Sequence, residues 1–314
     1  MNRRDFFEKS SLAAVGTAAT VGGAMAPLRP VWARERADLT VTELGEHLFL
    51  VSGGGGNVTV FHPDEGVLLI DGGSMGASAE VLELIRKRTG RKRVHTLFNT
   101  HWHWDHTGSN LELGTAGTRI ISHVNTKLWL SVDVDSQWEN RKYKRLPAKA
   151  LPNQTFYTPG SLMFGGATLS YALMPEAHTD GDIYVFFREA NVLVGGDVVS
   201  VNAYPILDTA SNGWITGNIN GLTSLKGLCN DATKVIPGKG GAQAPAHLEK
   251  QKEMLTTVRL RMAKMLAQGK SAQEMIDAQP TKEFDTEWGN PELFIRNAFR
   301  GISLRPQQMG VNVV

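Results

Sequence analysis

The fold of this chain is decided by ten residues that carry three histidines and a carboxylate, Asn99-Thr100-His101-Trp102-His103-Trp104-Asp105-His106-Thr107-Gly108. They follow the apolar run Thr96-Leu97-Phe98, so we expect them at the carboxyl end of a strand, where open α/β sheets place their sites. In an extended segment His101, His103 and Asp105 project to one side, because side chains alternate with period two, and His106 falls off that period. Imidazole nitrogen and carboxylate oxygen suit Zn²⁺. The stretch therefore predicts a metal site.

The residues before this stretch alternate between strand and helix patterns. Residues 39–70 contain three strand-like runs, separated by turn residues at Gly53–Gly56 and Pro63–Gly66. Ala77–Arg88 has apolar residues at helical spacing, and Val94–Phe98 returns to a strand. This order indicates a βαβ unit. Because no Lys-Ser/Thr pair follows the four glycines, we expect a mobile hairpin there rather than a phosphate-binding loop.

The second half of the chain has the same alternation and ends in helices. The expected strands are 167–173, 183–187, 192–194 and 234–236, and the expected helices are 217–228, 246–267 and 272–276. These elements predict an α/β sandwich with a helical C-terminal extension.

Residues 1–33 have the composition of an export signal. Arg3-Arg4-Asp5-Phe6-Phe7 is followed by an uncharged stretch, Ser10–Leu28, and then by the small-x-small pattern Val31-Trp32-Ala33. This order resembles a twin-arginine signal, so we expect cleavage after Ala33 and a periplasmic location. The uncharged stretch has 19 residues, so an uncleaved N-terminal anchor is the alternative.

Charge and cysteine content exclude several classes of protein. The chain has 33 Lys plus Arg and 31 Asp plus Glu; removing the four cations and two anions of residues 1–33 leaves 29 of each. With no basic surplus, we expect neither nucleic acid nor an anionic membrane as partner after signal removal, and a small molecule as substrate. Cys229 is the only cysteine, so the chain can form no intrachain disulfide and no cysteine-built zinc finger. It is expected in a helix away from the histidines.

The histidine stretch resembles the His-x-His-x-Asp-His motif of the metallo-β-lactamase superfamily, in a glyoxalase II-like form. Three further segments match that family in order. Val67–Gly73 is similar to its early strand ending in Asp-x-Gly, Ala177–Asp182 to the segment with the next metal histidine, and Val194–Asp197 to the strand end with a bridging carboxylate. The resemblance implies an αββα sandwich over residues 34–245, with residues 246–314 as a helical extension packed on the same domain.

The resemblance also implies a set of ligands. It makes His101, His103 and His178 the ligands of a first zinc. It places Asp105 and His106 at a second metal, with Asp197 bridging the two sites or serving the second. Asp71 would orient the ligand loop by hydrogen bonds without binding metal itself.

One position departs from the family pattern. The family has Pro-Gly-His-Gly where this chain has Pro237-Gly238-Lys239-Gly240, so Lys239 occupies a ligand position. A protonated ammonium has three donors and no lone pair, and therefore cannot bind zinc. Either a weak second metal is held by Asp105, His106 and Asp197, or Lys239 replaces its charge and one zinc remains. We favour one zinc, because a cation beside two carboxylates offsets their repulsion.

These residues favour a zinc-dependent hydrolase. Zinc lowers the pKa of a bound water from about 15.7 to about 7 and polarises a carbonyl or phosphoryl oxygen. We expect attack on an ester, lactone, thioester, amide or phosphoester of a small molecule, with Asp105 orienting the water or shuttling its proton. Lys239 would stabilise the developing oxyanion or bind a substrate carboxylate. A non-haem iron dioxygenase on the same fold and a non-catalytic exported metal- or ligand-binding protein are the alternatives.

Five other residues are weaker candidates for the site. His123 ends an expected strand near the motif, and Tyr204 and Asn218 lie where this superfamily often contacts substrate. Trp102 and Trp104 alternate with the histidines, so we expect both near the metal.

Overall fold

The fold described here is a computed structural model that describes residues 38–91 and 93–305. These described residues form one compact unit. The expected export signal, residues 1–33, lies outside the described residues. Within the described ranges, none of the helices is long and apolar enough to cross a membrane.

The first of two large sheets has seven strands in the order β1-β2-β3-β4-β5-β6-β9. Strands β4 and β5 pair in parallel and are joined by helix α1, which confirms the expected βαβ unit. Strands β6 and β9 continue the parallel part of the sheet. The strand bounds are Thr40–Gly45 (β1), Leu48–Ser52 (β2), Val58–Phe61 (β3), Val67–Ile70 (β4), Val94–Phe98 (β5), Arg119–His123 (β6) and Gln154–Phe156 (β9).

The second sheet has five strands in the order β10-β11-β12-β13-β14. Its first four strands are antiparallel, and β14 pairs in parallel with β13. A separate two-stranded hairpin is formed by β7 and β8. The bounds are Val134–Ser136 (β7), Arg141–Tyr143 (β8), Gly160–Phe164 (β10), Ala167–Leu173 (β11), Ile183–Phe187 (β12), Val192–Gly196 (β13) and Lys234–Pro237 (β14).

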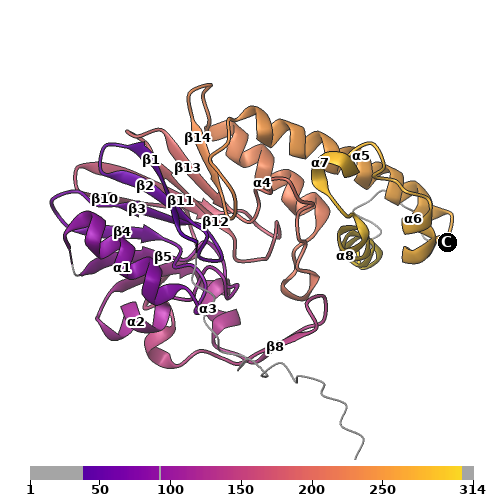
Figure 1. The fold of residues 1–314 in the computed structure, drawn as a ribbon. Helices are drawn as coiled ribbons and strands as arrows, with labels where there is room; N and C mark the ends of the chain where they lie inside the picture. The colour runs from indigo at the N-terminus through magenta and orange to yellow at the C-terminus, as the bar shows by residue number, and fades with distance from the viewer. Residues whose placement is uncertain (1–37, 92, 306–314) are drawn as a thin grey trace, which may run out of the picture. The chain divides into compact units, whose positions relative to one another are not determined.

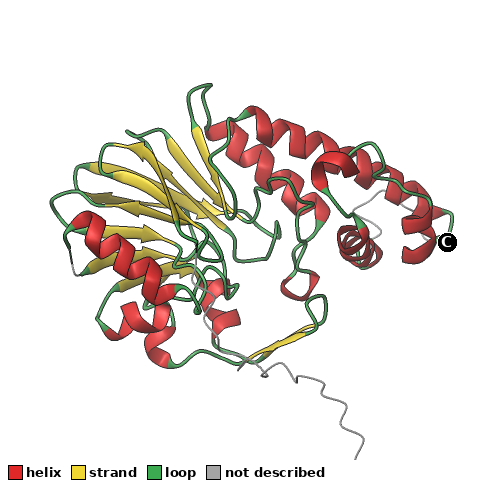
Figure 2. Ribbon diagram, in the orientation of Figure 1, coloured by secondary structure: helices red, strands yellow, loops and turns green. Residues whose placement is uncertain are grey.

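Helices cover the outer face of each sheet, as Figures 1 and 2 show. Helices α1 and α2 pack on the first sheet, through buried residues such as Val81, Ile85 and Leu113. Apolar side chains of both sheets fill the layer between them, including Phe98 and Ile236. The predicted αββα sandwich is therefore confirmed. The helix bounds are Ser78–Thr89 (α1), Asn110–Thr115 (α2), Val124–Leu130 (α3), Ile215–Leu228 (α4), Ala246–Ala267 (α5), Ala272–Asp277 (α6), Asp285–Trp288 (α7) and Glu292–Ser303 (α8).

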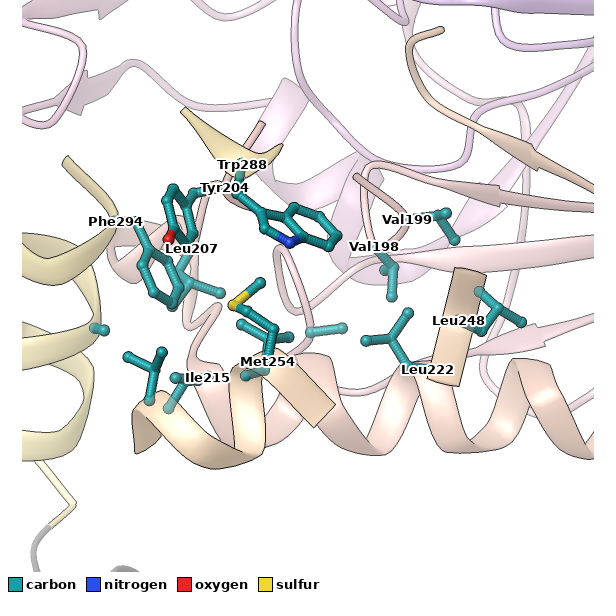
Figure 3. Close-up of a cluster of buried hydrophobic side chains, with 14 of the residues drawn as sticks. Val198, Val199, Tyr204, Leu207, Ile215, Leu222, Leu248, Met254, Trp288 and Phe294 are labelled. Atoms are coloured by element: carbon teal, nitrogen blue, oxygen red, sulfur yellow. The ribbon is translucent and has the colours of Figure 1, made fainter. Parts of the chain in front are cut away.

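The C-terminal helices share one apolar core with the second sheet. This core joins Leu193 and Val235 of the sheet to residues of α4, α5, α7 and α8. In Figure 3, Trp288 and Phe294 lie beside Tyr204, whose ring stacks on Phe294 at 5.0 Å between centroids. The sequence position of Cys229 had suggested that it lies within a helix. In the structure it directly follows α4.

Substitutions at two neighbouring residues of α8 test whether the C-terminal helices and the sandwich unfold together. Phe294 is 2% exposed and Leu293 is 40% exposed. We expect Phe294→Ala to lower the free energy of unfolding by about 3–5 kcal/mol in urea titrations, because a buried ring is lost. The control Leu293→Ala should change it by less than about 0.5 kcal/mol. Two separate transitions, of which Phe294→Ala shifts one, would contradict a shared core.

Candidate metal centre

The candidate site is built from residues that follow the carboxyl ends of five strands. Asp71 follows β4, residues 99–108 follow β5, and His178 lies in the loop after β11. Asp197 directly follows β13, and Lys239 is the second residue after β14. Because β4 and β5 are parallel, as are β13 and β14, their carboxyl ends bring these loops to one edge of the sandwich.

The histidine loop turns instead of continuing as a strand. The amides of His106 and Thr107 both donate to the carbonyl of His103, at 3.1 and 3.2 Å, so the expected extended segment is wrong. Asp71 holds the start of the turn: one oxygen accepts from the amide of Thr100 at 2.7 Å, and the other accepts from its hydroxyl at 2.7 Å. The hydrogen bonds expected of Asp71 are therefore present.

The loop at Gly53–Gly56 joins β2 to its antiparallel neighbour β3, so the expected hairpin is present. It packs against the histidine loop, and the amide of Gly56 donates to the carbonyl of Asp105 at 2.8 Å. A Cβ at Gly56 would lie 2.6 Å from that same oxygen. A close backbone contact therefore requires glycine at position 56.

Three buried imidazoles face one another. His178 Nδ1 lies 2.7 Å from the carbonyl oxygen of Ile206, which can only accept, so Nδ1 carries the proton and Nε2 carries a lone pair. His103 Nε2 lies 3.1 Å from Asp208 Oδ2. Although burial opposes the charge of Asp208, hydrogen bonds from His103 and Ser211 hold its pKa at about 2, so this carboxylate also accepts.

The proton-free nitrogens of these two rings therefore point at each other. His103 Nδ1 and His178 Nε2 lie 2.9 Å apart. Burial and the neighbouring His103 lower the pKa of His178 to about 4, so the His178 ring is neutral at neutral pH. His101 Nε2 is buried without a hydrogen-bond partner among the described residues, and the three rings offer ligand atoms within 4.8 Å of one another. This arrangement fits a metal cation held by three imidazoles.

A second group lies beside the first. His106 Nδ1 is 2.8 Å from Asp71 Oδ2, which leaves Nε2 facing Asp197 Oδ1 at 3.0 Å. Neither of these two facing atoms makes a hydrogen bond within the described residues, and His101, His106 and Asp197 form a second set with ligand atoms within 4.8 Å. Burial opposes a charge on His106, but Asp197 and Asp71 raise its pKa well above the usual value. The negative charge around His106 Nε2 thus favours a positive charge there, which either a proton on that nitrogen or a metal in its place can supply.

Lys239 places a further positive charge beside Asp197. Its Nζ lies 2.6 Å from Asp105 Oδ2 and 3.5 Å from Asp197 Oδ2. Although burial opposes its charge, Asp197 and Asp105 hold the pKa of Lys239 above its usual value, so it remains an ammonium and not a metal ligand. Gly238 permits this approach, because a Cβ there would lie 1.7 Å from Asp197 Oδ1.

Two carboxylates that the sequence reasoning missed position the histidines. Asp208 accepts from His103 and also from Trp138 Nε1 at 3.1 Å. Asp182 accepts from the amides of His178 and Thr179, each at 2.7 Å, and so fixes the loop that carries His178. Asp182 could have been found from the sequence, because it belongs to the segment 177–182 that resembles the family's histidine-bearing segment. Asp208 belongs to no segment for which a motif was recognised.

The weaker candidates have mainly structural contacts. His123 is the N-cap of α3 and accepts from the amide of Asn125. Tyr204 donates to Asp285 at 2.8 Å, and buried Asn218 accepts from Gln251 at 3.3 Å. Trp102 does lie near the site, with its ring centroid 4.5 Å from that of His103.

A small cavity opens beside the site. It has a volume of about 90 Å³ and is lined by Asp197, Lys239, Ser200, Tyr204 and apolar neighbours. A reacting group placed there would touch both the ammonium and the carboxylate.

Comparison with known proteins agrees with this geometry. A family model described as the metallo-beta-lactamase superfamily matches residues 51–261, which is more than half of the chain. This chain belongs to the metallo-β-lactamase superfamily. Metallo-beta-lactamase IND-1 of Chryseobacterium indologenes is 25% identical over 175 residues, which cover 56% of this chain and 67% of that protein. Metallo-beta-lactamase type 2 of Bacillus sp. (strain 170) is 25% identical over 189 residues, or 59% of this chain and 66% of that protein.

Solved structures share the fold of this superfamily member. A metallo-beta-lactamase from Pontibacter korlensis has a TM-score of 0.58 at 21% identity, covering 69% of this chain and 99% of its own. The sec-alkylsulfatase Pisa1 from Pseudomonas sp. has a TM-score of 0.65 at 13% identity, covering 83% of this chain and 50% of its own. At these identities the likeness is one of fold.

The contact between Asp208 and His103 gives a testable expectation. We expect Asp208→Asn to weaken metal binding by about 10–100-fold. The amide nitrogen of Asn would face the N–H of either His103 or Trp138 and could not accept its hydrogen bond, so His103 would be held less firmly. Competition with a chromophoric chelator measures this affinity. Asp64→Asn, at an exposed carboxylate that pairs with Arg91, is the control. Equal affinities in both variants would show that Asp208 does not orient His103.

Proposed function

We propose that this chain is a hydrolase that depends on one zinc ion and acts on an ester, lactone, thioester, amide or phosphoester of a small molecule. The observation that carries the proposal is the pair of facing lone pairs on His103 and His178, beside the unpartnered nitrogen of His101. In this proposal the three imidazoles hold the zinc. When bound, zinc supplies an activated water and polarises the substrate oxygen.

The protein's own residues position the reactants. Asp105 lies 2.6 Å from Lys239, and the charges of His106 and Lys239 hold its pKa below the usual value, although burial opposes this. An ionised Asp105 accepts hydrogen bonds, and so can orient a water or take its proton. Lys239 lines the cavity, and in this proposal its ammonium stabilises negative charge that develops on a substrate oxygen there.

Lys239 also bears on how many metals bind. Asp105 and Asp197 would repel each other without a cation, and Lys239 lies within ion-pair distance of both. We propose that its charge takes the place of a second metal. This role is separate from the hydrolase proposal, since one zinc and an activated water suffice for hydrolysis.

A second candidate function rests on the other ligand set. His101, His106 and Asp197 offer two imidazoles and one carboxylate, which is the ligand set of non-haem iron oxygenases. Oxygen consumption by the iron-loaded protein, with no hydrolysis by the zinc-loaded protein, would favour it. The glyoxalase II-like character of the motif and periplasmic export by a twin-arginine signal remain proposals from the sequence.

Turnover with and without metal tests the hydrolase proposal. We expect the purified protein to hydrolyse at least one member of a panel of aryl esters, lactones, thioesters, β-lactams and phosphodiesters. Chelation should abolish that activity, and added zinc should restore it. A zinc-loaded protein that turns over no member of the panel would point to the non-catalytic binding protein instead.

Variants of Lys239 test its role in charge balance. We expect the wild type to hold one zinc per chain, and Lys239→His to hold closer to two, because imidazole offers a lone pair. Lys239→Met should lower turnover by about 10²-fold, since the charge facing the cavity is lost. Elemental analysis and initial rates measure these effects, with exposed Lys264→Met as control. Unchanged metal content and turnover in both Lys239 variants would refute the role.

A further inference from the structure

The β7–β8 hairpin lies beside the metal centre and carries an arginine, Arg141, that stacks on Trp104 of the histidine loop. Trp138, in the hairpin turn, donates to Asp208 at 3.1 Å, and its ring centroid lies 6.0 Å from that of His103. Tyr143 of β8 packs edge-on against Trp102, with centroids 5.5 Å apart. The hairpin is thus attached to the histidine loop at both of its ends.

Arg141 of this hairpin stacks on two aromatic rings. Its guanidinium carbon lies 4.4 Å from the ring centroid of Trp104 and 5.0 Å from that of Tyr143. Trp104 stands between His103 and Asp105 in the sequence and is 38% exposed. Stacking holds the guanidinium in place and covers its faces, while the N–H groups at its edge remain available.

Arg141 differs from the other cations of the hairpin in its charge balance. Lys142 lies 3.5 Å from Asp135, and Lys144 and Arg145 lie 2.7 and 3.6 Å from Asp133. No carboxylate of residues 38–91 and 93–305 forms such an ion pair with Arg141. Arg141 therefore has no ion-pair partner among the described residues, although Glu139 accepts a hydrogen bond from Tyr143, on whose ring Arg141 stacks.

Lys239 is a poorer site for an anion than Arg141. Its ammonium already lies 2.6 Å from Asp105 and 3.5 Å from Asp197. A substrate carboxylate approaching Lys239 would meet these two negative charges, whereas Arg141 is paired with none. Binding of an anionic group is therefore better assigned to the hairpin.

We propose that Arg141 binds an anionic group of the substrate, a carboxylate, phosphate or sulfate, beside the metal centre. The proposal rests on the proposed hydrolase function and makes Arg141 a specificity-determining residue of that reaction. The planar guanidinium can donate two parallel hydrogen bonds to such a group. The preferred substrate then has a hydrolysable bond at one end and an anion at the other.

Binding measurements decide the role of Arg141. Isothermal titration calorimetry of the zinc-loaded protein with succinate, inorganic phosphate and sulfate shows which anion it prefers, and neutral succinamide is the reference ligand. We expect Arg141→Ala to weaken binding of the preferred anion by about tenfold or more, and Arg141→Lys to be intermediate, because the point charge remains without the planar fork. Arg145→Ala, on the same hairpin but at a paired cation, should bind as the wild type does.

Turnover separates this proposal from the proposed function. We expect the wild type to prefer mono-p-nitrophenyl succinate over p-nitrophenyl butyrate, and Arg141→Ala to lose that preference through KM with little change in kcat. If the wild type hydrolyses neither ester, the proposed function fails for aryl esters, and calorimetry still decides the role of Arg141. Equal anion binding by the wild type and Arg141→Ala, or no anion binding by either, would overturn the proposal.

Discussion

The contact on which this site depends is the approach of two imidazole nitrogens that both lack a proton, His103 Nδ1 and His178 Nε2, at 2.9 Å. Each nitrogen is left with a lone pair because the opposite nitrogen of its ring donates to a group that can only accept, Asp208 or the carbonyl of Ile206. Lone pairs at this distance repel unless a cation lies between them. Buried polar groups without partners are rare in folded proteins. The unpartnered Nε2 of His101, beside these two rings, therefore also indicates a site for a cation.

The fold brings these rings together by ending strands at one edge. The two parallel pairs, β4 with β5 and β13 with β14, present Asp71, the histidine loop, Asp197 and Lys239 from two different sheets. Asp71 links the parts, since it accepts from Thr100 and lies 2.8 Å from His106. This member of the metallo-β-lactamase superfamily thus brings three buried histidines together and places an ammonium near two carboxylates.

Much of this site was accessible from the sequence because the motif at residues 99–108 and three further segments resemble the metallo-β-lactamase superfamily in order. That resemblance implied the αββα sandwich, and the structure brings the strand ends at Asp71 and Asp197 to the histidine loop. Asp208 was not accessible, since an aspartate in an irregular loop has a turn as its default interpretation. Asp208 determines which ring nitrogen of His103 carries the proton. Because Asp208 is distant in the sequence, the residues around His103 do not encode that choice.

Short elements were missed for a related reason. Strands β7 and β8 have three residues each, and α2 and α3 have six and seven, which is too little chain for a hydrophobic period to emerge. The stacking of Arg141 on Trp104 depends on that hairpin and became visible only with the fold. The extended conformation expected for the histidine motif failed because hydrogen bonds to the carbonyl of His103 close a turn there.

The most direct measurement is anomalous diffraction at the zinc edge from crystals of the zinc-loaded protein. One peak among His101, His103 and His178, with the Lys239 ammonium still between Asp105 and Asp197, is the expected result. The absence of a peak among the three imidazoles, or a second full peak that displaces Lys239 from the two carboxylates, would contradict a single-zinc centre balanced by a lysine.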